Sequence, residues 1–341
     1  MRTTVAIWFL LHVLQAIAKE ETLRLAPRSE EARANEFPYQ VSIEINGQHT
    51  CGGALISRIH VLTAAHCIHN LIEKPWLLRK SIEVTVSVGS AFLGQGSRYP
   101  IRRLSEYRDY VGESRTYIVR NDIAVITLQY PVKTSSNVMP LVLPHPNFNP
   151  AVGTEVVVSG FGSAYKKGRA SPILKQSPMI IVSHEDCNEE FLTKVGKFIV
   201  PSIICAEFGK HAGTCQGDSG GPLVYQNGEE NIVVGIVSAG VEECGDGTPD
   251  TYTRVTSFLP YIEYEMNYDP NNAKKSERGL SSRAVDLVSS TPRTTESPYP
   301  IRIPRKSNKF GNFFNDFDND DPFQGIFSHF GLRSSGQRFP W

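Results

Sequence analysis

Short apolar runs separated by turn residues dominate the middle of the chain. Several runs alternate apolar and polar positions, as a half-buried strand does, and others are continuously apolar. The runs are Tyr39–Ile45, Ala54–Ile56, Ile82–Val88, Ile123–Leu128, Glu155–Ser159, Met179–Val182 and Asn231–Ser238. Helical spacing is scarce before Val255–Met266. This pattern predicts an all-β fold, either a sandwich or a pair of barrels, with one C-terminal helix.

The first 18 residues follow another pattern. Arg2 lies in a short polar end, and a mostly apolar run follows from Val5 to Ile17. Ala16 and Ala18 are small residues at the two positions that a signal peptidase reads. The run is too short to span a bilayer, and no later stretch reaches the roughly 20 apolar residues that a span needs. We interpret residues 1–18 as a secretory signal, the alternative being a buried N-terminal helix, and we expect a secreted, extracellular protein without a membrane span.

The last 73 residues, 269–341, show neither the two-residue period of a strand nor the 3.6-residue period of a helix. Prolines in the stretch 290–304 stand too close together for a helix, and the Phe residues of 310–330 lie among Asn, Asp and Gly. Neither part resembles a packed core, so we predict a disordered C-terminal tail. Lys274 and Lys275 are either a processing site or a solvated pair.

Composition narrows the class of protein. Hydrophobic residues make up 40% of the 341 residues, enough for a sizeable core, and 35 basic residues balance 35 acidic ones. A neutral chain favours neither nucleic acid nor an anionic membrane as a partner. Six cysteines in a secreted chain indicate three disulfides, and 15 pairings are open at this point.

Three segments carry candidate chemistry: LTAAHC (62–67), NDIAVITL (121–128) and GTCQGDSGGPLV (213–224). The third places the Ser219 hydroxyl among glycines, where the backbone can turn tightly and bring its own N–H groups to a reacting carbonyl. A serine is a poor nucleophile until a base removes its proton, and the base needs a third group to orient it. His66 and Asp122 are the candidates for these two positions.

With these motifs in the order His, Asp, Ser, the chain resembles the trypsin/chymotrypsin family of serine endopeptidases. FPYQVS (37–42) and CGGALIS (51–57) resemble the opening strands of that family's first barrel. The resemblance covers roughly Glu36 to Met266. It implies two six-stranded Greek-key β-barrels with the active site between them, the His66 and Asp122 side chains from the first barrel and Ser219 from the second.

The resemblance also implies a role for each of these residues. Ser219 would attack the peptide carbonyl, His66 would act as base and then as acid, and Asp122 would orient His66. The backbone N–H groups of Gly217 and Ser219 would form the oxyanion hole. Asp218 would pair with a freshly exposed α-amino group and so convert a zymogen into an enzyme.

Further expectations rest on the same resemblance. Ser238 matches the serine beside the catalytic aspartate, the alternative being a plain strand-end hydroxyl. No cofactor or metal is expected, because the segment 89–100 lacks the paired carboxylates of a calcium loop. The disulfides implied are Cys51–Cys67, Cys187–Cys205 and Cys215–Cys244.

Four positions bear on which substrates are cleaved. Gly213 stands where trypsin-like members carry a pocket-floor Asp, so simple tryptic specificity is not expected. Asp250 stands on another wall where most members have Gly, and Gly240 keeps the entrance open. This pocket, to which we also assign Ser238, resembles the crustacean collagenase (brachyurin) type and predicts cleavage after both basic and bulky apolar residues. The alternative is that Asp250 faces outward.

The N-terminal region departs from the family. Where Ile-Val-Gly-Gly is expected, the chain reads TLRLAPRS (22–29). Cleavage after Arg24 is the best substitute, which gives a pro-segment of residues 19–24 and a protease domain of 25–268. Leu25 would then enter the activation pocket, but Pro27 restricts the backbone there.

Two functions from different classes follow. The first is a secreted, monomeric serine endopeptidase that acts on proteins or peptides and meets an activating protease and inhibitors. The second is a secreted, non-proteolytic binding protein with a protease-like fold and impaired zymogen activation. The complete His66, Asp122 and Ser219 set favours the enzyme.

Overall fold

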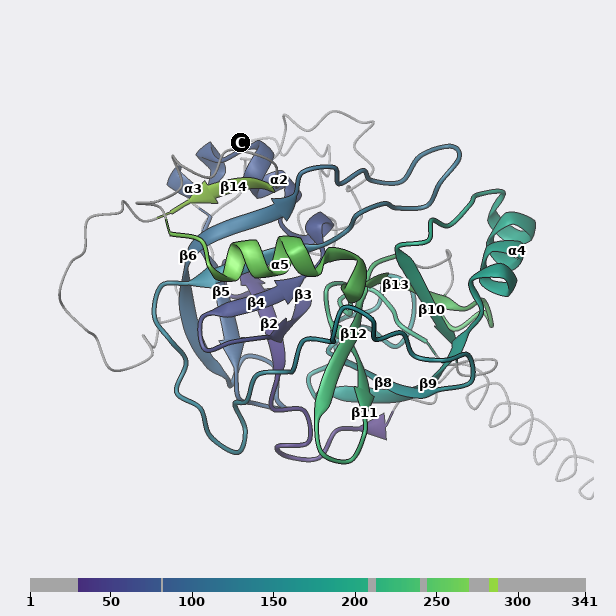
Figure 1. Cartoon of the computed structure of the whole chain (residues 1–341). Helices are drawn as coiled ribbons and strands as arrows, with labels where there is room; N and C mark the ends of the chain where they lie inside the picture. The colour runs from purple at the N-terminus through teal and green to yellow at the C-terminus, as the bar shows by residue number, and fades with distance from the viewer. Residues whose placement is uncertain (1–29, 81, 208–212, 240–243, 270–281, 288–341) are drawn as a thin grey trace, which may run out of the picture.

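The computed structural model describes residues 30–80, 82–207, 213–239, 244–269 and 282–287. The predicted signal, the pro-segment and Lys274–Lys275 lie outside the described residues, as does most of the tail. Strands account for most of the fold, and they form two antiparallel sheets that lie side by side (Figure 1).

The first sheet closes into a six-stranded barrel. β2 is paired with β3 and β5, β3 with β4, and β4 with β7, while β6 joins both β5 and β7 and so closes the ring. The apolar side chains of β2 and β7 are buried in its centre, which explains why these runs read as strands in the sequence. Its strands are β2 Gln40–Ile45, β3 Gln48–Leu55, β4 His60–Thr63, β5 Val84–Val88, β6 Ser97–Tyr107 and β7 Ala124–Leu128.

The second sheet closes in the same way through the β8–β9 pair. Its strands are β8 Glu155–Gly160, β9 Lys175–Val182, β10 Ile203–Glu207, β11 Pro222–Gln226, β12 Asn231–Val237 and β13 Asp250–Arg254. A short 3₁₀ helix η2, Val255–Phe258, then leads into helix α5, Leu259–Met266. Two closed six-stranded barrels followed by a C-terminal helix confirm the predicted fold.

The chain has more helix than the sequence pattern indicated. η1 Ala65–Cys67, α2 His69–Glu73 and α3 Trp76–Lys80 follow β4, and α4 His184–Val195 lies at the far end of the second barrel (Figure 1). The prediction of a single C-terminal helix was therefore incomplete. α4 buries only Cys187 and Phe191, so it has no wide apolar stripe to reveal it. Its signals were its ends, Ser183 as N-cap and Gly196 as a left-handed C-cap.

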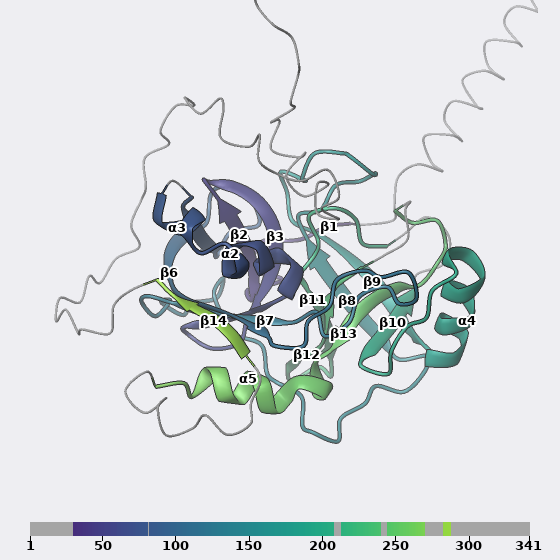
Figure 2. The same cartoon turned by 90° about the horizontal axis from the view of Figure 1, so that it is seen from above.

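Each barrel carries a seventh strand from near one end of the described part of the chain. β1, Glu30–Glu31, pairs with β9 of the second barrel, and β14, Ser282–Asp286, pairs with β6 of the first (Figure 2). The expectation of a disordered tail is therefore wrong for 282–287. In this segment apolar Val285 and Leu287 stand on either side of charged Asp286, a pattern too short to stand out within the tail.

None of the helices in the described part of the chain is both long and apolar enough to cross a membrane.

Candidate active site

The three predicted triad residues stand at the ends of short elements where the barrels meet. His66 lies in η1 directly after β4, Asp122 lies just before β7, and Ser219 lies just before β11. The Gly52 N–H of the first barrel donates to the Ser219 carbonyl of the second at 2.8 Å, so the serine loop is anchored across the junction.

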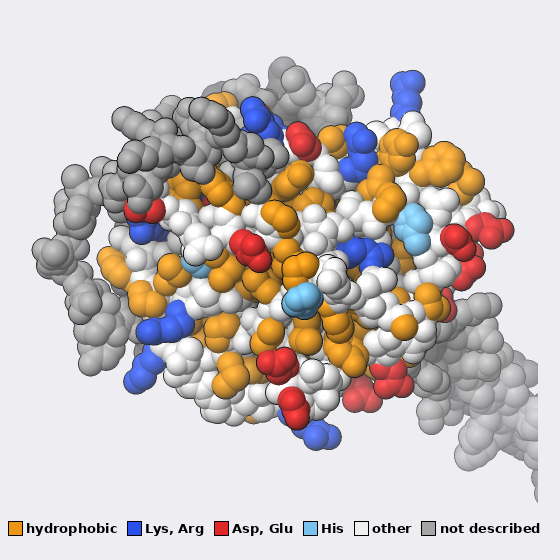
Figure 3. Space-filling model, viewed as in Figure 1, with side chains coloured by type: hydrophobic (Ala, Val, Ile, Leu, Met, Phe, Trp, Pro, Cys, Tyr) orange, Lys and Arg blue, Asp and Glu red, His pale blue; other side chains and the backbone are white. Residues whose placement is uncertain are grey.

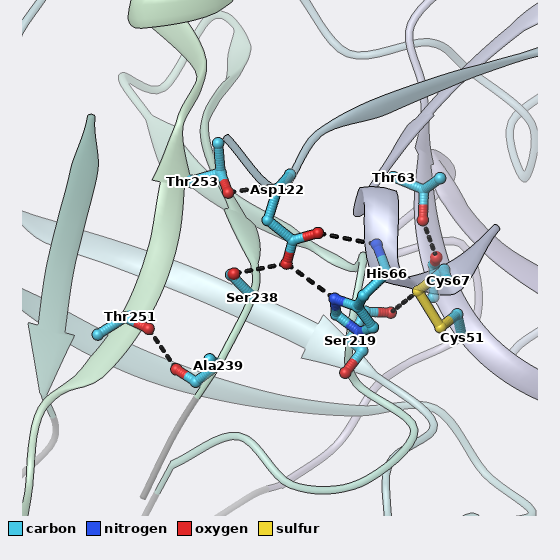
Figure 4. A network of polar contacts seen from close by, with 11 residues as sticks. Cys51, Thr63, His66, Cys67, Asp122, Ser219, Ser238, Ala239, Thr251 and Thr253 are labelled. Carbon is cyan, nitrogen blue, oxygen red and sulfur yellow. Dashed lines mark hydrogen bonds and ion pairs between the residues drawn. A yellow bond between two sulfur atoms is a disulfide. The ribbon is translucent and has the colours of Figure 1, made fainter. Parts of the chain in front are cut away.

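His66 is held against Asp122 by two hydrogen bonds. Its ring Nδ1 lies 2.8 Å from Asp122 Oδ2, and its backbone N–H donates to Asp122 Oδ1 at 2.9 Å. Figure 4 shows the imidazole ring between the Asp122 carboxylate and the Ser219 side chain. With Nδ1 directed to the carboxylate, the other ring nitrogen faces the serine, which is the orientation that a base for Ser219 requires.

The second barrel also fixes Asp122. The Ser238 hydroxyl donates to Asp122 Oδ2 at 2.6 Å, and the Thr253 hydroxyl donates to the Asp122 carbonyl at 2.7 Å (Figure 4). Ser238 is thus a hydrogen-bond partner of the Asp122 carboxylate. Thr253 was missed because it belongs to an ordinary strand, β13, and no sequence signal distinguishes it.

The two groups favour each other's charged form. Burial lowers the pKa of His66, but the Asp122 charge and hydrogen bond raise this pKa above its ordinary value. Burial raises the pKa of Asp122, whereas the charge of His66 and the hydrogen bonds from His66 and Ser238 bring it below its ordinary value. A carboxylate that stays ionised beside the ring is what stabilises an imidazolium.

The backbone before Ser219 has the turn that the glycines predicted. Gly217 has φ 99° and Gly220 has φ 80°, and a Cβ on Gly220 would collide with the Thr63 hydroxyl. The Asp218 N–H donates a hydrogen bond to the Cys215 carbonyl at 3.0 Å. No acceptor for the Gly217 and Ser219 N–H groups is found in the described part of the chain, and the oxyanion hole formed by these two groups stays a prediction.

Asp218 points away from this turn, toward a pocket in the second barrel. Its carboxylate accepts the Gly162 N–H at 2.7 Å and the Cys215 N–H at 3.0 Å. Burial raises its pKa to about 6, against the lowering effect of these bonds and of the Lys175 charge. Gly162 was missed, although only a residue without a side chain fits beside this carboxylate.

The pocket beside Asp218 lies next to β1. Lys175 and Gln176 line this pocket together with Gly160, Gly162 and Asp218. β1 pairs Glu31 with Lys175 and Glu30 with Gln176. The first described strand, β1, therefore lies beside the wall of this pocket.

His49 is a second histidine that sequence reasoning missed. Its Nδ1 lies 2.8 Å from the Ser42 hydroxyl, and its Nε2 lies 3.0 Å from the Gly217 carbonyl. Burial lowers its pKa to about 4, so the ring is neutral and donates to Gly217 through Nε2. This contact helps hold the peptide unit between Gly217 and Asp218, directly before Ser219.

The positions expected to set specificity come together in part. Asp250 is buried, its carboxylate accepts the Thr214 N–H at 2.6 Å, and a Cβ on Gly213 would lie 2.8 Å from it. The side chain thus faces Gly213 and not the solvent. Burial raises its pKa to about 7, opposed by the hydrogen bonds from Thr214. Gly240 lies outside the described residues.

Three disulfides join the pairs that the resemblance implied. The first ties the middle of β3 to the His66 segment, the second ties α4 to β10, and the third ties the serine loop to residue 244. They are Cys51–Cys67, Cys187–Cys205 and Cys215–Cys244.

Comparison with known proteins agrees with this geometry. The family model for Trypsin matches residues 27–262, a span that includes both barrels and all three predicted triad positions. The chain belongs to the trypsin family of serine proteases.

Individual members of the trypsin family match over most of their length. Serine protease SP24D of Anopheles gambiae is 32% identical over 235 residues, which cover 69% of this chain and 79% of that protein. The clotting factor G beta subunit of Tachypleus tridentatus is 32% identical over 249 residues, covering 68% and 76%. The solved structure of human heparin binding protein matches with a TM-score of 0.59 and 28% identity, covering 72% of this chain and 98% of that one.

Proposed function

We propose that this trypsin-family protein is a secreted serine endopeptidase in which His66, Asp122 and Ser219 form the catalytic triad. The observation that carries the proposal is the doubly hydrogen-bonded His66–Asp122 pair with its imidazole beside Ser219. Three disulfides fit an oxidising compartment outside the cytosol.

The reaction follows from the positions of these atoms. Ser219 Oγ attacks the peptide carbonyl carbon while its proton passes to His66 Nε2, and the oxyanion accepts the N–H groups of Gly217 and Ser219. Collapse breaks the C–N bond, and the amine leaves with the proton from Nε2. Water then attacks the Ser219 ester by the same steps and releases the acid, so that the enzyme is restored.

We propose that activation pairs a new α-amino group with Asp218. The raised pKa of this carboxylate, about 6, is that of a group which gains from a cation. β1 begins at the wall of the pocket beside Asp218, which supports delivery of the chain end to it. Leu25, exposed by cleavage after Arg24, is the end that we expect to enter.

We propose a mixed primary specificity, with Asp250 as the residue that accepts basic side chains. The lack of a side chain at Gly213 makes room for this carboxylate, which has no basic partner in the described part of the chain, and a substrate Arg or Lys would supply a countercharge. Bulky apolar side chains would bind the same wide pocket when the carboxylate is protonated. Specificity of the brachyurin type follows from this arrangement.

An organophosphonate serine probe tests the proposed function. The full chain is treated briefly with trypsin, exposed to the probe and analysed by mass spectrometry for its N-terminus and its labelled residue. We expect labelling of Ser219 only in chains whose N-terminus is Leu25, and none in Ser219→Ala. Correctly processed chains that stay unlabelled would refute the enzyme.

A secreted binding protein without proteolysis is the second candidate. The absence of Ile-Val-Gly-Gly from the sequence favours it, and one similar structure is that of a heparin binding protein. Heparin is a polyanion, whereas acidic and basic side chains are interspersed on the face seen in Figure 3 and the chain is neutral overall. We therefore place the enzyme first, and the labelling experiment separates the two.

A further inference from the structure

The strand β14 follows β6 in a defined antiparallel register. Ser282 stands opposite Tyr107, Asp286 stands opposite Arg103, and the Leu287 N–H donates to the Arg102 carbonyl at 2.8 Å. Hydrogen-bonded and non-hydrogen-bonded pairs alternate in such a ladder. Val285 therefore occupies a hydrogen-bonding position, as Leu287 does, whereas the N–H of Ala284 points away from β6.

β14 covers an edge that the barrel itself leaves open. Residues 101–106 of β6 pair with β7 on one edge, and β5 pairs with β6 only from Ser97 to Pro100. The other edge of residues 102–107 would carry unpaired backbone groups, which a further strand can satisfy. Figures 1 and 2 show β14 in this place, between α2 and α5.

Two ion pairs fix the register. Arg283 stands opposite Glu106 with Nε 3.1 Å from Oε1, and Asp286 stands opposite Arg103 with Oδ1 3.2 Å from Nη1. Arg283 also reaches Glu73 of α2 at 2.5 Å. A slip by one residue would turn every side chain to the opposite face and break both pairs.

β14 also supplies a charged partner for Glu106, a buried residue of β6. Its side chain is fully buried, and a buried carboxylate is costly without partners. Its partners are His69, with Nδ1 at 2.9 Å, and Arg283. A permanent positive charge at this position therefore comes from β14, because His69 carries charge only when it is protonated.

The opposite face of β14 joins α5 to the same site. Arg103 bonds Glu265 of α5 at 3.1 Å and lies 3.8 Å from the centre of the Tyr268 ring. Asp286 of β14 is the second acidic partner of Arg103, beside Glu265. Val285 and Leu287 meanwhile pack against the main apolar core. The backbone hydrogen bonds, the ion pairs and the apolar contacts thus all involve the same short segment, residues 282–287.

We propose that residues 102–107 of β6 form a strand-docking site whose occupant is residues 282–287 of this chain, and that this contact holds the tail on the catalytic unit after the connection is cut. The stretch between Tyr268 and Ser282 contains Lys274 and Lys275, so a trypsin-like activator has basic residues to cleave there. Such cleavage leaves two chains that remain associated. The docking contacts do not involve the triad, so the proposal stands apart from the proposed function.

The test uses the full chain with Ser219→Ala, which prevents self-cleavage, and a recognition sequence for a site-specific protease inserted after Lys275. After cutting, size-exclusion chromatography shows whether the C-terminal fragment elutes with the barrels. We expect co-elution of the unaltered sequence. Separation of its fragment at micromolar protein would overturn the proposal.

Matched variants identify the contact. Val285→Pro removes a ladder hydrogen bond and should release the fragment, whereas Ala284→Pro alters an outward N–H and should retain it. Arg283→Glu should weaken fragment binding by about tenfold or more, since it places like charges opposite each other. Arg293→Glu, the same change elsewhere in the tail, should have no effect. Equal release by both proline variants, with circular dichroism of the barrels unchanged, would also refute docking through the strand.

Discussion

Asp122 shows how single residues from both barrels build one charge site. Its carboxylate and carbonyl oxygens accept hydrogen bonds from His66 N, His66 Nδ1, Ser238 and Thr253. A buried carboxylate with this many donors stays ionised and fixed, so it can hold a single orientation of the His66 ring. The barrels must therefore be docked before the base is aligned.

Removal of one donor tests this arrangement. We expect Ser238→Ala to lower kcat by about tenfold and to leave KM nearly unchanged, because a hydrogen bond to a charged group is worth about 1.5–3 kcal/mol and only part of that bears on the transition state. Ser87→Ala, at a buried serine of β5, is the control and should keep full activity. Unchanged kcat in Ser238→Ala would show that this hydroxyl does not position Asp122.

The proposed role of Asp250 predicts that the primary specificity depends on pH. Its pKa of about 7 means that the carboxylate is mostly neutral at pH 6 and mostly charged at pH 8. Across this range the charged form that would bind Arg rises about tenfold and the neutral form that would bind Leu falls about tenfold, so the ratio of kcat/KM for Arg over Leu substrates should rise about a hundredfold. Taking the ratio cancels the titration of His66.

Asp250→Asn is the matched control for that measurement. The amide keeps the shape of the side chain but has no charge to gain, so its Arg over Leu ratio should be low and independent of pH. A pH-dependent ratio that persists in Asp250→Asn would assign the effect to another group.

At the scale of elements, short segments position the site and longer ones stabilise it. The triad residues lie in η1 and in the loops before β7 and β11, while α4 lies away from them at the far end of the second barrel (Figure 1). α4 was missed because only Cys187 and Phe191 face the core, whereas β2 was predicted from alternating apolar and polar residues and β7 from a mostly apolar run. Elements with a narrow buried face carry little periodic signal.

The cap of α4 provides a test of this division. The Ser183 hydroxyl accepts the Asp186 N–H at 3.0 Å. Ser183→Ala should lower the free energy of unfolding by about 1 kcal/mol, measured by urea denaturation, and should leave kcat/KM unchanged. Ser183→Asp, which retains the cap, should restore the stability. A loss of activity in Ser183→Ala would show that α4 is coupled to the triad.

At the scale of the whole molecule, two closed barrels are linked across one junction and carry an added strand each. β1 and β14 bring segments near the two ends of the described chain to opposite barrels. One disulfide lies in the first barrel at the junction, one braces α4, and one braces the serine loop. Because the three disulfides brace different parts of the fold, we expect the loss of each one to have different effects on stability and activity.

Paired replacement of cysteines tests that prediction. Cys187→Ala with Cys205→Ala should lower the free energy of unfolding by about 3 kcal/mol and preserve kcat/KM at 25 °C, because this bridge is remote from the triad. Cys215→Ala with Cys244→Ala should have a similar cost in stability. It should also raise KM, because this bridge joins the loop that carries Ser219 to the segment that leads to Asp250. Equal kinetic effects of the two pairs would contradict this distinction.

The sequence by itself determined the fold class, the three motifs and the identity of the triad candidates. Apolar alternation within short runs permits only strands, and a serine among glycines with a histidine and an aspartate in family order limits the chemistry. These signals are local, because each depends on residues a few positions apart. The sequence could not reveal Gly162, Thr214 or His49, which have no motif of their own.

Only the tertiary structure decided which distant groups meet. Thr253 reaches Asp122 across 131 positions, and Arg283 reaches Glu106 across 177, so no local pattern could record either contact. The direction of Asp250 and the strand within the tail were settled in the same way, by the space and the open edge that the closed barrels offer. Burial and charge balance exist only once the chain has folded, and they turn a list of residue types into a site.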